Sequence, residues 1–291
     1  MTRDNSLGSR LFDIFVYTVL LGVVVVTLFP VLHVAAVSLS SSAVSMNTIG
    51  IFPKELTASA YEKIFKGGMV PRGLLNSILY TAAGTLVNML FTVLTAYPLA
   101  KKQLPFRRLY TLLFTFTMFF SGGIIPSFLL VVNLNLYNTV WALILPGAIS
   151  TWNLIIMRTF FQAVPVELEE AASIDGANEL TTLTKIVLPL SKAAIATIGL
   201  FYAVGHWNSW LPANMYLRSS SLHPLQLILR SIVIRNTALA EMAVETEDLV
   251  RVSTDSIKYA TLFVSILPMM LVYPFIQKYF AKGVMIGSLK G

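Results

Sequence analysis

Six long runs of apolar residues constrain the fold of this chain more than any other feature. A helix of roughly 20 residues crosses the hydrocarbon core of a bilayer, and a helix satisfies its own backbone hydrogen bonds in lipid. The sequence therefore predicts an all-α integral membrane protein with six transmembrane helices, forming one transmembrane domain over residues 1–291. The expected spans cover about residues 11–37, 74–99, 109–132, 139–157, 187–207 and 259–280.

The composition excludes several other classes of protein. Hydrophobic residues make up 56% of the chain and charged residues 12%, whereas a soluble domain carries about 25% charged residues. The net charge of +7 comes from basic residues that flank apolar runs, which indicates anchoring at membrane lipid rather than binding of nucleic acid. Cysteine is absent, so disulfides, thiolate metal sites and cysteine nucleophiles are excluded.

The positions of the basic residues predict the orientation of the spans. Lys101, Lys102, Arg107 and Arg108 crowd the short connection between the second and third runs, whereas residues 133–138 contain no Lys or Arg. Short cytoplasmic loops are enriched in Lys and Arg. The loop around residue 101 is therefore expected to be cytoplasmic, and both termini with it. This arrangement predicts a multi-pass membrane protein.

Two longer connections, residues 38–73 and 208–258, are expected on the outer side. Loops of this length are usually functional or disordered. A short helix is predicted over about residues 58–65, and the alternation of Leu225, Leu227 and Leu229 predicts partial order in the second connection.

An acidic loop, residues 165–186, interrupts the apolar sequence. Five carboxylates fall between Glu167 and Glu179, and no acid occurs between Glu62 and Glu167. Pro165 is suited to open a helix, and Asp175-Gly176 is expected to break it. A second short helix is predicted up to Ile186. With the orientation above, this loop is expected to lie in the cytoplasm, where another protein could bind it.

No motif in the sequence supplies chemistry or energy. The expected spans contain no Asp or Glu in their interiors, although an ion-coupled carrier normally buries one. The dipeptide Gly-Lys of a phosphate-binding loop is absent, and the three histidines stand far apart. The chain is thus predicted to be no enzyme, with no catalytic residue, cofactor or metal of its own, so a partner must supply the energy for uphill transport.

The acidic loop resembles the signature of bacterial ABC-type importer permeases. That signature is Glu-Ala-Ala, three residues, Gly, nine residues and Ile-x-Leu-Pro, and residues 170–189 match every fixed position. The tail, residues 277–291, is similar to that of the carbohydrate-uptake branch, and the 208–258 connection to that of its maltose-type second permeases. The chain also resembles permeases for oligosaccharides such as aldouronates.

The resemblance implies a type I ABC importer permease fold, a place in the bacterial cytoplasmic (inner) membrane and a set of partners. These are a second homologous permease forming a heterodimer, a cytoplasmic ATPase dimer that holds ATP and Mg, and an external solute-binding protein that delivers a sugar or oligosaccharide. Glu170 would pair with a basic residue of the ATPase, Ala171 and Ala172 would pack closely against it, and Gly176 would permit the bend. The residues implied in ATPase coupling are Glu170, Ala171, Ala172, Asp175, Gly176, Ala177, Ile186, Leu188 and Pro189.

Substrate contacts are a separate hypothesis. Sugars are held by aromatic faces and by hydrogen-bonding amides, and six residues of these kinds lie in or beside the spans. They are Asn88, Trp152, Asn153, His206, Trp207 and Asn208. Interhelical hydrogen bonding and interfacial tryptophan belts explain the same residues, and the sugar site can also lie wholly in the partner permease.

Three other functions remain open on the sequence. A permease of the same class could carry an amino acid or a metal ion instead of a sugar. A secondary carrier or channel would work alone, and reconstituted single chains would then accumulate sugar without ATP. A membrane-embedded enzyme or sensor would need catalytic residues that the sequence lacks.

Overall fold

The computed structural model describes residues 7–41, 50–53, 55–242, 256–274 and 277, and the side chains of all of these except 235–242. These residues are almost entirely helical, with one isolated β-bridge between Ser40 and Leu56. Most of the tail that resembles the carbohydrate branch, residues 278–291, lies outside the described residues, as does much of the polar run at 243–255.

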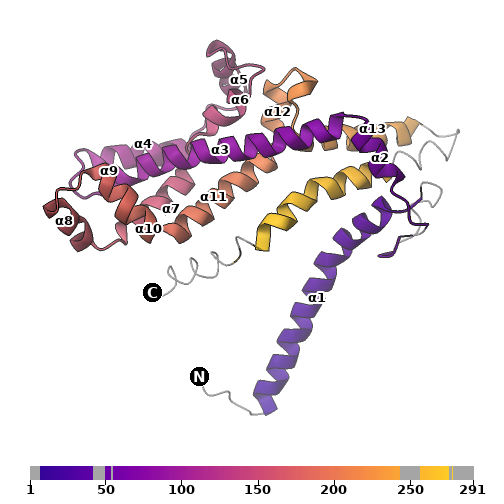
Figure 1. Ribbon diagram of the computed structural model, residues 1–291, viewed down its shortest axis with the longest axis horizontal. Coiled ribbons are helices and arrows are strands. Elements are labelled where there is room, and N and C mark those ends of the chain that lie inside the picture. Colours follow the sequence, from indigo (N-terminus) through magenta and orange to yellow (C-terminus); the bar gives the residue numbers. More distant parts are fainter. Residues whose placement is uncertain (1–6, 42–49, 54, 243–255, 275–276, 278–291) are drawn as a thin grey trace. The chain divides into compact units, whose positions relative to one another are not determined.

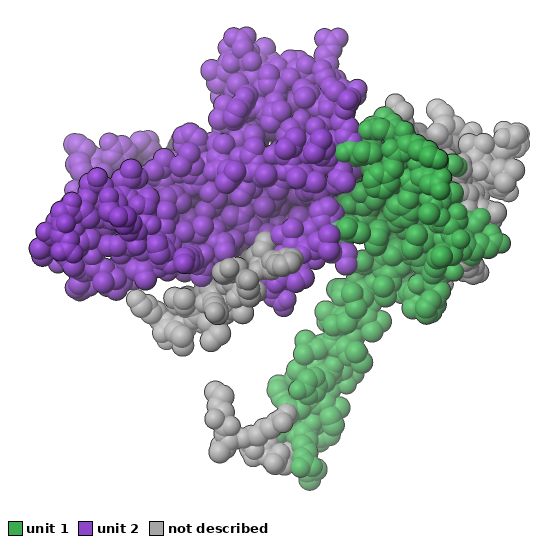
Figure 2. Space-filling model, in the orientation of Figure 1, with its two compact units in different colours: residues 1–71, 229–267 green, residues 72–228, 268–291 purple. Residues whose placement is uncertain are grey.

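The contacts of the chain group it into two compact units, shown in different colours in Figure 2. Unit 1 comprises residues 1–71 and 229–267, and unit 2 comprises residues 72–228 and 268–291. Each unit therefore combines segments that are distant in the sequence.

Unit 1 contains α1 (Leu7–Ser38) and α2 (Ser59–Lys66). The most apolar stretch of α1 has no residue buried against the described protein, as expected of a helix that faces lipid. Near its end, the His33 ring stacks on Phe29 and meets the edge of Tyr259. The short helix predicted over about residues 58–65 is confirmed as α2.

Unit 2 is built along α3 (Met69–Ala100), and Figure 1 shows α7 (Thr151–Gln162) and α11 (Lys192–Trp207) running beside it. At about 1.5 Å per residue, the 32 residues of α3 exceed the thickness of a bilayer core. The three helices share one core with Leu183 and Val187, which lie at the C-terminal end of the acidic loop. Its buried members are Ala96, Tyr97, Leu99, Leu154, Met157, Phe161, Leu183, Val187, Ala194, Ile198 and Tyr202.

Three of the six expected spans are interrupted in the structure, each as a bent pair of helices. The run 109–132 becomes α4 (Arg107–Phe119) and α5 (Ile124–Asn133), which meet at 115°. Between them lies Gly123 at φ +84°, a conformation that glycine adopts without steric cost. A sharp turn at this point replaces the continuous helix that the apolar pattern predicts.

The other two interruptions coincide with proline. The run 139–157 becomes α6 (Trp141–Ile144) with the 3₁₀ turn η1 (Leu145–Gly147), followed by α7 at 55°. The run 187–207 is bent by 86° between the segment ending at α10 (Leu188–Leu190) and α11. Pro146 and Pro189 lie in the first positions of the short turns that precede these bends, where the missing backbone donor is tolerated.

The described residues thus contain three helices that are long and apolar enough to cross a membrane: α1, α3 and 256–274. The number rises to six if each bent pair forms one span. Part of the 208–258 connection is ordered, as predicted, into α12 (Leu211–Tyr216), η3 (Ser220–Leu222) and α13 (Leu225–Met242). Leu225 and Leu227 are buried there.

Candidate functional site: the acidic loop

The acidic loop folds into two short helices, α8 (Val166–Ile174) and α9 (Glu179–Thr182). Pro165 immediately precedes α8, as predicted, and Glu167 and Glu169 occupy its first turn, where the helix dipole favours carboxylates. The Asn178 side chain caps α9 by accepting a 2.8 Å hydrogen bond from the Thr181 backbone N–H.

The two helices are joined by a turn that depends on Gly176. The Ala177 N–H donates to the Ala172 carbonyl at 2.9 Å, and the Gly176 N–H donates to the Ser173 carbonyl at 3.1 Å. This pair of bonds is a Schellman motif, which ends a helix with one residue in the left-handed conformation. Gly176 is that residue, at φ +81°. The predicted break at Asp175-Gly176 is confirmed.

Beyond α9 the chain forms a π-helical turn, η2 (Leu183–Val187), in which the Leu188 N–H bonds to the Leu183 carbonyl. Such turns insert one residue into a helix and are frequent at functional sites. Pro189 follows directly, and Ser191 marks the 86° bend into α11. The Ile-x-Leu-Pro part of the motif therefore forms the corner that connects the loop to a candidate span. Ile186 and Leu188 are half-buried in this corner, and Pro189 is exposed.

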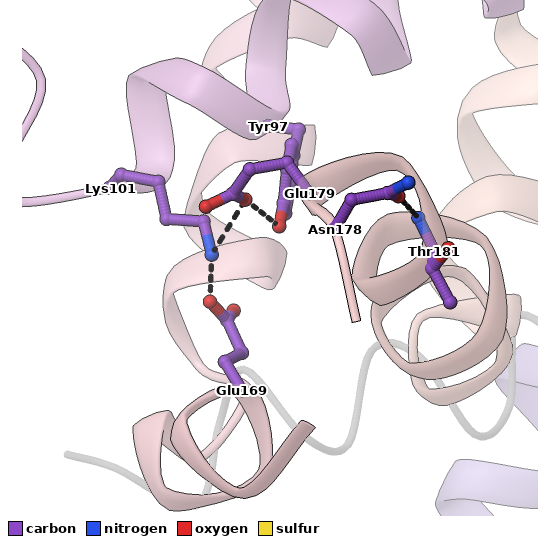
Figure 3. Close-up of polar contacts among 6 residues, drawn as sticks. All are labelled: Tyr97, Lys101, Glu169, Asn178, Glu179 and Thr181. Carbon is purple, nitrogen blue, oxygen red and sulfur yellow. Dashed lines mark hydrogen bonds and ion pairs between the residues drawn. The ribbon is translucent and has the colours of Figure 1, made fainter. Parts of the chain in front are cut away.

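A cluster of charged and aromatic side chains ties the loop to the end of α3 (Figure 3). Lys101 Nζ forms an ion pair with Glu169 Oε2 of α8 and lies 3.7 Å from Glu179 Oε2 of α9. The Tyr97 hydroxyl donates a 2.6 Å hydrogen bond to Glu179, and the Lys101 ammonium lies 4.5 Å from the centre of the Tyr97 ring. The side chains of Lys101 and Glu169 are 22% and 16% exposed, so water screens their attraction only partly.

The loop also presents a solvent-exposed face. Glu170 is exposed and makes no hydrogen bond or ion pair with the described residues. Ala171 is exposed, and Ala172 and Ala177 are half-buried. Beside them, Ile174 is 86% exposed and Leu180 is 64% exposed. Apolar side chains this exposed on an otherwise charged loop indicate a contact surface for another molecule.

A groove of about 1280 Å³ separates the acidic loop from the basic connection that follows α3. One wall carries Lys101, Lys102 and Arg107, and the other carries Glu167, Glu169 and Glu170. The sequence pattern identified both charged segments but not their proximity, because about seventy residues separate them. Tyr97, Lys101 and Glu169 are thus contributors that the motif alone did not reveal.

Of the six candidate substrate contacts, the structure brings Asn88 and His206 together. The Asn88 amide donates to the Gly147 carbonyl at 2.8 Å, and His206 Nε2 lies 3.4 Å from Asn88 Oδ1. This approach requires Gly84, because a Cβ there would lie 2.5–2.7 Å from atoms of the His206 ring. The pair therefore joins α3, α11 and the η1 turn.

The other four candidates are placed separately. Trp207 is buried, whereas Asn208 is exposed just after α11 and donates from its amide to the Val204 carbonyl at 3.0 Å. Asn153 is buried in the first turn of α7, and Trp152 beside it is 58% exposed. An interfacial position explains Trp152 equally well.

A polar stripe along α3 was not singled out by the sequence pattern. Thr81, Thr85, Asn88 and Thr92 follow helical spacing on one face. Thr92 shares a 2.7 Å hydrogen bond with Tyr202, whereas the buried hydroxyl oxygens of Thr81 and Thr85 have no partner among the described residues. Buried hydroxyls without a partner among the described residues are unusual.

These features define a class of protein: a multi-pass helical membrane protein whose ordered, polar loop exposes an apolar contact face. The described residues contain no group of three His, Cys, Asp or Glu side chains that could hold a metal ion. Residues 89–286 match the family described as the binding-protein-dependent transport system inner membrane component. The chain belongs to this family. It is a non-enzymatic translocation subunit of an inner-membrane ABC importer, which works with an ATPase and a solute-binding protein.

Similar proteins cover nearly the whole chain. Protein LplC of Bacillus subtilis (strain 168) is 43% identical over 294 residues, covering 100% of this chain and 98% of that protein. The polygalacturonan/rhamnogalacturonan transport system permease protein YtcP of the same organism is 44% identical, covering 97% and 99%. A crystal structure of a bacterial ABC transporter involved in the import of the acidic polysaccharide alginate contains a similar chain. It matches with a TM-score of 0.84 and 31% identity, covering 96% of this chain and 100% of that one. The resemblance noted in the sequence is confirmed.

Proposed function

We propose that this chain is a sugar- or oligosaccharide-carrying permease of type I ABC fold, and that its acidic loop is the coupling element that receives the force of ATP binding. The observation that carries the proposal is the loop itself. It matches the family signature, it is held at a fixed angle by the Schellman turn and the Lys101 cluster, and it exposes Glu170 beside Ile174. An exposed carboxylate next to an apolar side chain suits a cleft with a basic rim.

The rigid attachment of the loop supports a lever role. Force applied to α8 would pass to α3 through the Lys101–Glu169 ion pair and to α11 through the corner at Pro189. Both helices share the main core of unit 2. Closure of an ATPase dimer on ATP and Mg would therefore tilt candidate spans together, which is what alternating access requires.

The proposed topology has six spans with both termini and the acidic loop in the cytoplasm. The three bent helix pairs count as one span each in this proposal. The basic connection after α3 supports the orientation, since positive residues favour the cytoplasmic side. The Lys101–Glu169 ion pair joins the acidic loop to that connection, which supports placing both on the same side.

The proposed substrate is a sugar or oligosaccharide. Similar permeases are described for polygalacturonan/rhamnogalacturonan, for galactooligosaccharides in GanQ of Bacillus subtilis (strain 168) and for arabinooligosaccharides in AraQ of Halalkalibacterium halodurans. The unpaired hydroxyls of Thr81 and Thr85, near Asn88, are groups that could bond to sugar hydroxyls along α3. A second homologous permease would complete the path as a heterodimer, and an external binding protein would deliver substrate to the 38–73 and 208–258 connections.

The test uses the assembled transporter in membranes. Glu170→Ala or Gly176→Trp should abolish transport and weaken ATPase pull-down while leaving insertion of the permease unchanged. Glu167→Ala, an acid of the same helix outside the signature, is the matched control and should retain both. Wild-type pull-down by Gly176→Trp would contradict the proposal, as would ATP-independent sugar accumulation by the chain alone, which would favour a secondary carrier.

A further inference from the structure

A pocket of about 500 Å³ lies between α4 and α7, apart from the polar stripe of α3 and the contact face of the acidic loop. Three arginines and two threonines line it together with one leucine: Arg107, Arg108, Arg158, Thr111, Thr115 and Leu112. No carboxylate lines the pocket. Three positive charges around one cavity favour the binding of an anion.

Arg107 and Arg158 are held in place by hydrogen bonds, whereas Arg108 is exposed. Arg107 donates from Nε to the Leu99 carbonyl at 3.0 Å, and Arg158 Nη1 donates to Thr111 Oγ1 at 3.3 Å. The buried Nε of Arg158 has no hydrogen-bond partner among the described residues. None of the three arginines forms an ion pair within that part of the chain. The contacts to a backbone carbonyl and to a threonine therefore position the guanidinium groups of Arg107 and Arg158 without neutralising them.

The surroundings of the pocket identify the kind of anion. Residues 107, 111 and 115 recur at helical spacing, so the polar lining runs along one face of α4 for two turns. Leu112 extends that face and is 64% exposed, and Leu109, Leu113 and Phe116 are also exposed on α4. A charged pocket that opens onto exposed apolar side chains matches a phospholipid, whose phosphate is charged and whose acyl chains are apolar.

We propose that the Arg107–Arg108–Arg158 pocket binds the phosphate of an anionic phospholipid, with its acyl chains along α4. Guanidinium groups suit this role because their donors match phosphate oxygens. The proposed orientation would place this lipid in the inner leaflet, but the binding proposal does not depend on that orientation. A bound lipid would link α4 to α7, the helix that leads into the acidic loop.

The experiment compares lipid retention by the purified, assembled transporter in nanodiscs of phosphatidylcholine with a minor fraction of phosphatidylglycerol. Mass spectrometry measures how much of each lipid stays bound per transporter. The wild type should retain phosphatidylglycerol in preference. Arg108→Gln and Arg158→Met should each lower that preference about fivefold, the change expected for one arginine near an anionic lipid. Arg158→Met also removes the unpaired buried donor, so it should fold.

Lys192→Gln is the matched control, because Lys192 is an exposed cation at the start of α11 that does not line the pocket. It should leave the preference unchanged. Added inorganic phosphate should not displace the lipid, since it lacks acyl chains. Equal retention by wild type and both arginine variants would overturn the proposal. Full displacement by inorganic phosphate would overturn it too, in favour of a site for a soluble phosphate.

Discussion

Lys101 is the residue on which the position of the acidic loop depends most. It is the shared cation of Glu169 and Glu179, which lie on two different short helices. Removing Lys101 leaves Glu169, whose side chain is only 16% exposed, desolvated without a counter-charge. The loop would then lose its attachment to α3 while keeping its internal turn.

We therefore predict that Lys101→Met uncouples the transporter. The attachment of the loop should weaken by about 1.5–3 kcal/mol, the usual contribution of a hydrogen bond to a charged group. Transport per ATP hydrolysed in proteoliposomes should fall severalfold. Lys102→Met, which removes a neighbouring exposed lysine, should change the ratio little. An unchanged ratio in Lys101→Met would show that the cluster does not transmit force.

Substitutions at Gly176 can distinguish a need for its backbone conformation from a need for a position without a side chain at the partner contact. Its φ of +81° disfavours residues with a Cβ, yet a Cβ built there meets nothing within 4 Å in the chain. Gly176→Ala should cost about 1–2 kcal/mol through the left-handed conformation, whereas Asn is better tolerated in that conformation.

The comparison of Gly176→Asn with Gly176→Ala is thus informative. If the backbone alone matters, ATPase association measured by pull-down should be near wild type for Gly176→Asn and reduced for Gly176→Ala. Equal loss in both variants would mean that the partner requires the absence of a side chain, and equal retention would refute the need for glycine.

At the scale of elements, the packing of α3 against α11 depends on one close approach. The His206 ring occupies the space that a Cβ of residue 84 would need. Residue 199 on α11 offers a comparison within the same helix pair, because a Cβ there would lie 3.9 Å from Met89 Sδ, an ordinary contact.

We predict that Gly84→Ala destabilises the permease by about 1–3 kcal/mol, the usual cost of overpacking, whereas Gly199→Ala is tolerated. Thermal stability of the purified complex measures the difference. The double variant Gly84→Ala/His206→Ala should recover much of the loss because it removes the clashing ring. Absence of recovery would place the effect of Gly84 elsewhere.

The elements also show what the sequence could predict. The ends of α8 follow from Pro165 and Gly176, because proline and glycine act on their own local backbone. The bends at Gly123 and Ser191 were not predicted, because hydrophobicity is the same on both sides of them. The Lys101 cluster and the arginine pocket were also missed, since each joins segments about fifty to eighty residues apart, and no local pattern records such pairing.

At the scale of the whole molecule, the proposed function makes the movement of this chain depend on a separate ATPase. The chain has no cysteine, so a single introduced thiol is unambiguous within it. Ile174, the most exposed apolar side chain of the acidic loop, is the position for that thiol. Leu211 of α12, also exposed, is the control on the side proposed to face outward.

The most direct test is site-specific cross-linking of Ile174→Cys in native membranes with a thiol-to-amine reagent. We predict that Ile174→Cys forms an adduct with the ATPase subunit and that the yield of this adduct changes when a non-hydrolysable ATP analogue is added. Leu211→Cys should form no such adduct. Failure of Ile174→Cys to cross-link to the ATPase in any nucleotide state, together with its labelling by a membrane-impermeant thiol reagent outside intact cells, would contradict the central claim.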